Sequence, residues 1–273
     1  MIRKVSLKTV LRKIYKRFFE RIIGKIFCES QTDILTKPFI FKRIIRTINQ
    51  KLNEKGYSVP WIYTKEECSE FWKEMDNAST SKGNRPENYA KKPREIIDFL
   101  HIFWAPQVDK NDSILEIGCN CGANLSWLSK LGYENLSGIE ISTEAIEQMK
   151  SSFPELNAKI YSGDIASLLP TLPSKSFDMI FTMAVAMHIH PKNNFLFSEI
   201  ARVSKKYICT IEPEVANSNY VFARNYRKLF HKIGIEQIKS VLITKEAFPD
   251  IAGYAGCVAR IYRTEKFMPH KGV

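Results

Sequence analysis

Two glycines separate an apolar run from a helical pattern in ILEIGCNCGANL, residues 114–125. Gly118 and Gly122 have no Cβ, so the chain can turn tightly there and let a ligand approach the backbone. Such a turn would lie at the carboxyl end of a strand, where open α/β sheets bind their ligands. The spacing matches neither Gly-x-Gly-x-x-Gly nor a Walker loop. Glu116, two residues before the first glycine, would repel a phosphate and favour a cationic ligand.

Two further acidic side chains follow the next two apolar runs. Glu140 ends the run LSGIE, and Asp164 stands in YSGDIASL. An acid at the end of a second strand can accept hydrogen bonds from the ribose hydroxyls of an adenosine. An acid after a third strand can accept one from the exocyclic amine of an adenine, while the neighbouring Ile165 packs on the ring. One such acid alone could be a solvated strand end, but three in succession are harder to explain in that way.

Two histidines follow a fourth apolar run in FDMIFTMAVAMHIHP, residues 177–191. His188 could take a proton from a hydroxyl group, because an imidazole titrates near neutrality. His190 is the alternative base. His188 could instead cap or pack the following helix. A metal site is not predicted, since no third ligand stands at metal-site spacing from this His-x-His pair.

Charged residues also follow a fifth apolar run, in IEPEVANSNYVFARNYRKLF, residues 211–230. Glu212 and Glu214 come directly after the run, and Arg224 and Arg227 stand on the helix predicted next. These residues could line an acceptor pocket, in which either arginine could bind a phosphate or a carboxylate. The alternative is a solvated helix face.

The elements that must position these residues begin at residue 111, where apolar runs alternate with helical patterns. Strands are predicted at 113–117, 136–139, 158–161, 177–181, 207–211, 237–243 and 257–263, and helices at 123–131, 143–151, 194–203 and 220–231. This alternation predicts an α/β, Rossmann-like fold with a seven-stranded, mostly parallel sheet and helices on both faces. No long helix separates the last two strands, so they are expected to form an antiparallel pair at one edge.

The net charge of +12 is concentrated at the N-terminus: residues 1–55 hold 15 Lys and Arg against 4 Asp and Glu, and the remaining residues hold 26 against 25. Residues 2–27 and the segment after Pro38 carry apolar residues at helical spacing, with basic residues opposite. In the second segment Ile48 and Leu52 belong to the apolar face. This basic amphipathic leader could lie on an anionic membrane, pack on the body, or dock onto another protein.

Three regions are predicted from these patterns: a basic helical leader over 1–55, a helical and loop cap region over 56–108, and a Rossmann-like domain over 109–273. In the cap region Thr64 begins a helix, with Glu67 as its capping-box partner. Polar residues 76–88 are predicted to form a mobile loop or lid. A helix is expected after Pro93, and the residues that it turns inward are Ile96, Ile97, Leu100 and Phe103.

The composition is that of a folded globular chain: of 273 residues, 44% are hydrophobic and 26% are charged. No apolar stretch approaches the roughly 18 residues that would cross a bilayer, and charges interrupt every apolar run near the N-terminus. The six cysteines show no zinc or thioredoxin-like spacing and are expected to be free thiols in a reducing compartment. The sequence therefore predicts a cytoplasmic protein, peripheral on the inner face of a membrane if the leader binds lipid.

The motifs LEIGCNCGANL, GIEIS, SGDIASL and FDMIFTMAVAMHIHP, in this order and spacing, resemble those of class I S-adenosylmethionine-dependent methyltransferases. The resemblance covers roughly residues 90–265 and implies S-adenosylmethionine as the cofactor. The cofactor contacts it implies are Glu116, Gly118, Cys119, Asn120, Gly122, Asn124, Glu140, Ile141, Asp164, Ile165, Thr182 and Met183. Glu140 would hold the ribose, and Asp164 with Ile165 would hold the adenine. One departure is Asn120, which stands near a position where the family often has a third glycine.

The resemblance implies methyl transfer to a small-molecule or lipid-linked acceptor, such as a sugar or polysaccharide precursor. O-methylation is expected, with His188 or His190 as the base. The chain has no Asn/Asp-Pro-Pro-aromatic motif of the nucleic-acid amino-methyltransferases, so no DNA partner is expected. The alternative is an RNA ribose methyltransferase that uses the leader as an RNA-binding arm. A protein that binds the cofactor without transferring its methyl group is the non-enzymatic rival. The sequence leaves open the acceptor atom and the oligomeric state.

Overall fold

The computed structural model describes residues 39–57, 63–73, 85–91, 94–215, 217–218 and 220–264. The α-helices are α3 (Phe39–Glu54), α4 (Lys65–Lys73), α5 (Pro86–Ala90), α6 (Glu95–Trp104), α7 (Ala123–Lys130), α8 (Thr143–Ser152), α9 (Ile165–Leu168), α10 (Phe195–Val203) and α11 (Tyr226–Lys232). Short 3-10 helices are η5 (Leu169–Thr171), η6 (Ala186–His188), η7 (Pro191–Asn193) and η8 (Pro249–Tyr254). The strands are β1 (Ile114–Ile117), β2 (Leu136–Glu140), β3 (Ala158–Ser162), β4 (Phe177–Met183), β5 (Ser204–Pro213), β6 (Asn217–Ser218), β7 (Val221–Phe222), β8 (Glu236–Leu242) and β9 (Cys257–Arg263).

Seven of the strands form one sheet in the order β3-β2-β1-β4-β5-β9-β8. Strands β1 to β5 are parallel, and β9 runs antiparallel to both β5 and β8. The predicted fold class and the antiparallel pair at one edge are therefore confirmed. The strand order reverses between β1 and β4, which places a topological switch point at their carboxyl ends.

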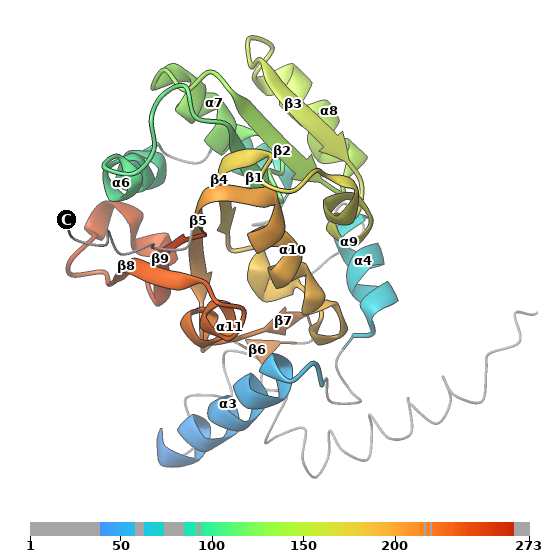
Figure 1. Cartoon of the computed structure of the whole chain (residues 1–273), viewed down its shortest axis with the longest axis vertical. Helices are drawn as coiled ribbons and strands as arrows, with labels where there is room; N and C mark the ends of the chain where they lie inside the picture. The colour runs from blue at the N-terminus through green and yellow to red at the C-terminus, as the bar shows by residue number, and fades with distance from the viewer. Residues whose placement is uncertain are drawn as a thin grey trace, which may run out of the picture.

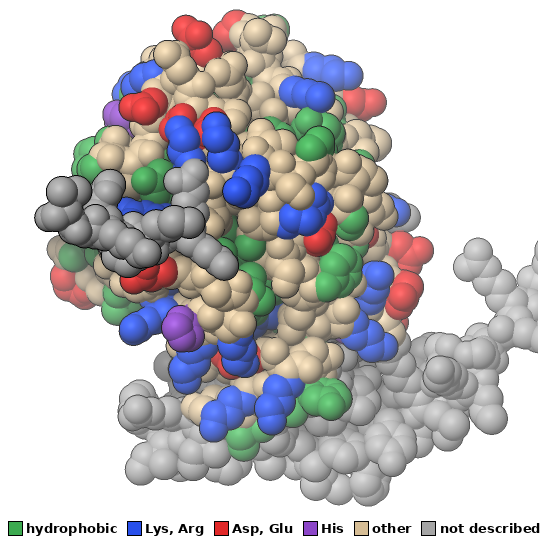
Figure 2. All heavy atoms as spheres, in the orientation of Figure 1, with side chains coloured by type: hydrophobic (Ala, Val, Ile, Leu, Met, Phe, Trp, Pro, Cys, Tyr) green, Lys and Arg blue, Asp and Glu red, His purple; other side chains and the backbone are tan. Residues whose placement is uncertain are grey.

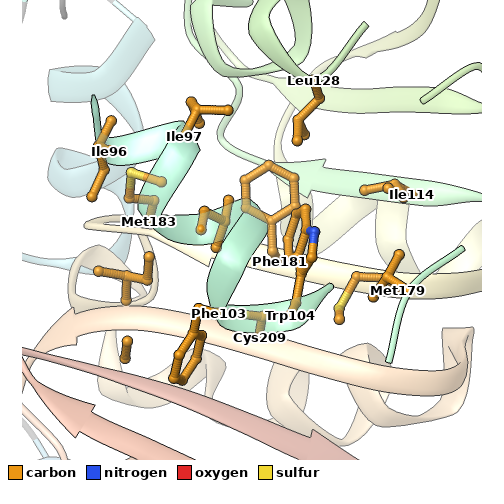
Figure 3. Packing of buried hydrophobic residues seen from close by; sticks show 14 of the residues in the cluster. Ile96, Ile97, Phe103, Trp104, Ile114, Leu128, Met179, Phe181, Met183 and Cys209 are labelled. Atoms are coloured by element: carbon orange, nitrogen blue, oxygen red, sulfur yellow. The ribbon is translucent and has the colours of Figure 1, made fainter. Parts of the chain in front are cut away.

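One face of the sheet is covered by α6 and α7 (Figure 1). Trp104 of α6 is fully buried and packs edge-on against Phe181 of β4, with 5.4 Å between the ring centroids. Figure 3 shows the Trp104 and Phe181 side chains between α6 and the strands, with Met179 and Leu128 around them. The sheet and α6 therefore share one hydrophobic core, although α6 falls in the predicted cap region. The three predicted region boundaries stay predictions.

The opposite face of the sheet is covered by α10 and α11. Leu115, Ile180 and Ile208 are fully buried there, whereas their neighbours Ile114, Met179 and Cys209 point into the first core. The central strands are thus buried on both sides, as is usual for parallel sheets. This double burial explains why they appear in the sequence as nearly continuous apolar runs.

The helix predicted at 220–231 begins only at Tyr226, so the prediction was wrong for residues 220–225. Val221 and Phe222 instead form β7, which pairs with β6 in a separate two-stranded sheet. The helix is capped by Asn225, whose side chain accepts a hydrogen bond from the Lys228 amide at 2.9 Å. Asn is among the preferred N-cap residues, so this start was readable from the sequence.

The second amphipathic segment of the leader forms α3, and near its end the buried side chains are polar. Asn49 and Asn53 are buried, whereas Ile48 is 43% exposed and Leu52 is only partly buried. The Asn53 side chain donates to the carbonyl of Ala223 at 3.1 Å. Polar hydrogen bonds therefore attach this end of α3 to the body. The helix predicted at 2–27 lies outside the described residues.

The predicted cap region contains α4, α5 and α6. The capping box at the start of α4 is confirmed: the Thr64 amide donates to the Glu67 carboxylate at 2.8 Å, and the Glu67 amide donates to the Thr64 hydroxyl at 3.1 Å. The inward-facing residues predicted for α6 are all buried. Most of the predicted loop at 76–88 lies outside the described residues, but Pro86 begins α5, so the loop prediction was wrong over its last three residues. Among the helices that the structure describes, none combines the length and apolarity that a membrane span requires.

Candidate active site

A cavity of about 380 Å³ lies at the carboxyl ends of β1, β2, β3 and β4. Of the predicted site residues, those in its wall are Glu116, Gly118, Cys119, Asn120, Asn124, Glu140, Ile141, Asp164, Ile165, Met183, His188 and His190. Two predicted residues are not in the wall, Gly122 and Thr182. Thr182 is buried within β4, and Gly122 precedes α7. The topology thus gathers residues that are far apart in sequence around one cavity.

The turn after β1 takes left-handed backbone angles at three positions. The φ angles are +72° at Gly118, +48° at Asn120 and +72° at Gly122. A Cβ on Gly118 would lie 2.6 Å from Val185 Cγ2, so the turn and the chain after β4 approach closely there. Asn120 tolerates its angle because its side-chain oxygen accepts the Cys121 amide at 2.7 Å. This bond explains how the chain makes the turn without the third glycine.

The cysteines on either side of Asn120 serve as packing residues. Cys119 and Cys121 are both buried, and neither forms a disulfide with any cysteine that the structure describes. Burial raises the pKa of Cys119 well above its usual range, and the nearby carboxylate of Glu116 adds to the rise. A thiol that stays protonated is a poor nucleophile. Burial and a raised pKa therefore favour a packing role over a nucleophilic one, and the expected free thiols are also found at Cys68, Cys209 and Cys257, which are buried.

The Glu140 carboxylate ties the end of β2 to the glycine turn. It accepts the backbone amides of Asn120 at 2.7 Å, Ile141 at 2.9 Å and Ser142 at 2.9 Å. Burial raises the pKa of Glu140, and these hydrogen bonds oppose the rise. A carboxylate offers about four acceptor positions, so about one is left for a ligand in this geometry. Glu140 therefore organises the site as well as facing the cavity.

The other two carboxylates are also held in defined positions. Glu116 is buried and accepts the Asn124 side-chain amide at 2.6 Å. Asp164 accepts the Ala166 amide at 2.8 Å through one oxygen and thereby caps α9. Its other oxygen accepts the Ser69 hydroxyl of α4 at 3.0 Å. Helix α4 therefore contacts Asp164 at the cavity, and the sequence did not predict this contact.

His188 lies in the loop after β4 with its ring in a defined tautomer. Its Nδ1 is 2.8 Å from the carbonyl oxygen of Tyr220. A carbonyl only accepts, so Nδ1 carries the proton and Nε2 carries the lone pair. Burial lowers the pKa of His188 to about 4, and the hydrogen bond to Tyr220 opposes this. His188 is therefore a neutral imidazole at neutral pH.

His190 has the opposite arrangement. Its Nδ1 accepts the Lys192 amide at 3.2 Å and caps η7. Its lone pair is thus used within the protein. Burial lowers the pKa of His190 to about 4, assisted by the charges of Lys192 and Arg224. Of the two predicted bases, only His188 combines a place in the cavity wall with a lone pair that no described hydrogen bond uses.

Aromatic side chains from outside the parallel strands close the cavity next to His188. The ring of Trp72 in α4 lies 4.3 Å from the His188 ring, and the ring of Tyr220 lies 5.8 Å from it. Trp72 and Tyr220 meet edge to face at 6.0 Å. Lys65 and Tyr254 also line the cavity. Sequence reasoning missed these residues, because no local pattern shows which distant segment covers a sheet edge.

The charged residues predicted at 211–230 do not line the cavity. Arg224 and Glu212 are fully buried in the protein. Glu214 forms an ion pair with Arg260 at 2.9 Å, and Arg227 lies outside the cavity wall. The prediction of an acceptor pocket from these side chains was therefore wrong, and so was the solvated-face alternative for Arg224. No group of three or more possible metal ligands occurs in the described part of the chain.

Comparisons with known proteins agree with this fold. Residues 115–207 match the family model described as a methyltransferase domain. The [4+2]-cyclase SpnF superposes with a TM-score of 0.56 at 14% identity, over 74% of this chain and 96% of its own. The PH0226 protein from Pyrococcus horikoshii OT3 gives 0.52 at 15% identity, over 64% and 93%. Magnesium protoporphyrin IX methyltransferase ChlM from Synechocystis PCC 6803, solved with bound SAH, gives 0.50 at 11% identity, over 94% and 99%. None of the curated proteins matches the chain.

The chain shares a Rossmann-like fold with these solved structures, and its glycine turn lies within the segment that matches the methyltransferase domain. The family match identifies an S-adenosylmethionine-dependent methyltransferase domain over residues 115–207 of the chain.

Proposed function

We propose that this enzyme O-methylates a small-molecule or lipid-linked acceptor and that His188 is its general base. The proposal depends on the neutral His188 in the cavity wall. Its Nδ1 donates to the Tyr220 carbonyl, and its Nε2 carries a lone pair that can accept a proton. A neutral imidazole can accept the proton that a hydroxyl acceptor loses on methylation. An amine acceptor would not require such a base.

The donor groups of the cavity fit S-adenosylmethionine. The ligand combines an adenosine with a positively charged sulfonium, and the cavity wall carries three carboxylates and a left-handed backbone turn. In the proposed arrangement Glu116, Gly118, Cys119, Asn120 and Asn124 surround the methionine part. Glu140 with Ile141 contacts the ribose, and Asp164 with Ile165 contacts the adenine. Met183, at the end of β4, faces the transferable methyl group.

When bound, the cofactor supplies an electrophilic methyl group on sulfur. The protein supplies proximity and orientation, since the transfer is an in-line displacement. With the cofactor bound, the acceptor oxygen would gain the methyl carbon, and the bond from that carbon to sulfur would break. The hydroxyl proton passes to Nε2 of His188, and the tautomer set by Tyr220 keeps that nitrogen unprotonated beforehand. The rings of Trp72 and Tyr220 pack beside the His188 ring and restrict its orientation.

Peripheral attachment to an anionic membrane is the second part of the proposal, and it supports a lipid-linked acceptor such as a sugar precursor. Ile48 and Tyr57 are 43% and 63% exposed, and Lys51 and Lys55 are exposed between them. Apolar and basic side chains are combined in this way in interfacial helices. Figure 2 shows Lys and Arg side chains gathered beside α3 and α11 on one face of the molecule.

Vesicle sedimentation tests the membrane part. Wild type should sediment with phosphatidylglycerol vesicles and not with phosphatidylcholine vesicles. The double variant Lys51→Glu/Lys55→Glu should sediment less. Lys130→Glu/Lys150→Glu, which changes the same charge at exposed positions elsewhere, should behave as wild type. Equal sedimentation of both double variants would contradict this part of the proposal.

Two histidine variants test the catalytic part. His188→Asn keeps a donor near the Tyr220 carbonyl but removes the Nε2 lone pair. His190→Asn keeps an acceptor for the Lys192 amide and serves as the matched control. Turnover is measured as the demethylated cofactor that forms when nucleotide sugars, isoprenoid-linked sugars or aromatic hydroxy acids are offered as acceptors. Cofactor affinity is measured by calorimetry.

His188→Asn should lower kcat by about 100-fold or more, the usual contribution of a general base, with cofactor affinity retained. His190→Asn should stay within about threefold of wild type. Unchanged turnover in His188→Asn would return His188 to a packing role. Methyl transfer to RNA in place of these acceptors would favour the ribose methyltransferase alternative.

A further inference from the structure

The loop between β4 and η7 has its backbone amides tied to one buried carboxylate. Val185 and Ala186 donate to Oε1 of Glu212 at 3.0 and 2.9 Å, and Met187 donates to Oε2 at 3.2 Å. Glu212 follows the end of the apolar run in β5 and is fully buried. Three successive amides therefore point at one carboxylate, immediately before His188 in the chain.

The carbonyl side of the same loop is tied to one buried guanidinium. Arg224 is fully buried, and its Nη2 donates to the Ile189 carbonyl at 2.6 Å. Its Nη1 donates to the Phe222 carbonyl at 2.7 Å and makes a longer contact of 3.5 Å with the Ala186 carbonyl. The rigid fork of a guanidinium suits such a set of fixed acceptors. His188 thus lies between carbonyls that Arg224 binds and amides that Glu212 binds.

The network continues from Arg224 to α3. Arg224 Nε donates to the Asn194 side-chain oxygen at 3.0 Å. The Asn194 side-chain nitrogen in turn donates to the Asn53 carbonyl at 2.7 Å. Asn53 is buried near the end of α3. Hydrogen bonds therefore connect the last turn of α3, through Asn194 and Arg224, to the loop that carries His188.

The backbone of this loop also carries strain. Ala184, its first residue, has a φ of +54° although it is not a glycine. Strained backbone persists where the surrounding structure determines it, and such positions cluster at functional sites. Burying both a carboxylate and a guanidinium is also expensive, and an apolar pair of similar volume is often as stable. A structural role alone is therefore a poor explanation for these residues.

We propose that Glu212 and Arg224 are positioning residues that set the loop so that His188 faces the acceptor, and that α3 completes this support through Asn194. The inference rests on the proposed function of His188 as the base. It gives α3 a role in turnover that is separate from any contact with a membrane. Neither Glu212 nor Arg224 touches the cavity, so both act through the loop.

The test compares Arg224→Lys with Arg202→Lys. Arg202 also binds backbone carbonyls, those of Leu172 at 2.9 Å and Leu169 at 3.1 Å, but it lies away from the cavity. Asn194→Ala, which removes the link between α3 and Arg224, is a second and milder variant in case Arg224→Lys fails to fold. The full chain is used, with kcat, cofactor affinity, unfolding temperature and the imidazole ¹⁵N signals of His188 as readouts.

Arg224→Lys and Asn194→Ala should lower kcat by about tenfold or more, with cofactor affinity within about threefold. The ¹⁵N signals of His188 should lose the single Nδ1-protonated pattern. Arg202→Lys should keep kcat and that pattern even if its unfolding temperature falls equally. Equal kcat in Arg224→Lys, Asn194→Ala and Arg202→Lys would overturn the inference, and so would lowered kcat with an unchanged His188 spectrum. If His188→Asn itself retains full turnover, the proposed function has failed, and that result is independent of these variants.

Discussion

Substitution of Gly118 by alanine should be costly for two separable reasons. Gly118 has a φ of +72°, and an added Cβ would lie 2.6 and 2.8 Å from the two Cγ atoms of Val185. Gly132 has a similar φ of +88°, but nothing lies within 4 Å of its added Cβ. Gly132→Ala is therefore a matched control that carries the backbone strain without the contact.

The expected free energies follow from these two terms. Left-handed backbone costs a residue with a Cβ about 1–2 kcal/mol, and both variants carry this cost. Overpacking adds about 1–3 kcal/mol to Gly118→Ala alone, because valine has no flexible end that could move aside. Gly118→Ala should thus lose about 2–5 kcal/mol of unfolding free energy and Gly132→Ala about 1–2 kcal/mol.

Urea unfolding of wild type and both variants measures these differences, provided that the m-values agree. Adding Val185→Ala to Gly118→Ala should recover part of the loss, so that the double variant is more stable than the sum of the single effects. Gly118→Ala should also weaken S-adenosylmethionine binding, because Gly118 lines the cavity. Equal unfolding free energies for the two glycine variants, or strict additivity with Val185→Ala, would refute the reasoning.

Three further predictions concern the cofactor site, acid stability and turnover. Asp164→Asn should weaken S-adenosylmethionine binding by about tenfold or more in calorimetry, since it removes a charged acceptor worth about 1.5–3 kcal/mol. Unchanged affinity would contradict the proposed contact between Asp164 and the adenine. The pKa of His190 is lowered to about 4, so the unfolded chain binds a proton at higher pH than the folded chain, and stability is lost as the pH falls from 6.5 towards 4. His190→Asn should therefore lose less stability than wild type between pH 7 and pH 5 in urea unfolding, and an equal loss would contradict the shift. The pKa of His188 is lowered to about 4 as well, so protonation of this base should not lower kcat between pH 8 and pH 5.5. If kcat fell with an apparent pKa near 6.5, and this fall were absent in His188→Asn, His188 would not be a neutral base with a lowered pKa.

The central sheet was predictable because its residues satisfy a local rule. Leu115, Ile180 and Ile208 face one core while their neighbours face the other, and double burial produces short, continuous apolar runs. The acids and glycines of the site were predictable for a related reason. They stand directly after these runs, and the carboxyl ends of parallel strands meet at one edge of the sheet.

Long-range packing explains what the sequence did not reveal. Ser69, Trp72 and Tyr220 reach the site only because α4 and the segment before α11 fold over the sheet edge. Local periodicity carries no information on which segment covers which edge. The burial of Arg224 likewise depends on carbonyl groups of a distant loop.

The register of α3 shows the same limit. Apolar spacing placed Ile48 and Leu52 on one face of the helix but did not show what that face contacts. In the structure, the side chain of Asn53 donates to the Ala223 carbonyl, and the carbonyl of Asn53 accepts the side-chain amide of Asn194. Buried polar groups require such partners. The helix therefore turns Asn49 and Asn53 inward and leaves Ile48 exposed.

The most direct test of the account is calorimetric titration of S-adenosylmethionine into wild type, Glu140→Gln and Glu155→Gln. Glu140 joins the glycine turn to the end of β2 at the cavity, whereas Glu155 is an exposed surface residue and serves as the control. Wild type and Glu155→Gln should bind one equivalent with equal affinity, and Glu140→Gln should bind about tenfold more weakly or worse. Wild-type affinity in Glu140→Gln would contradict the placement of the cofactor at this cavity.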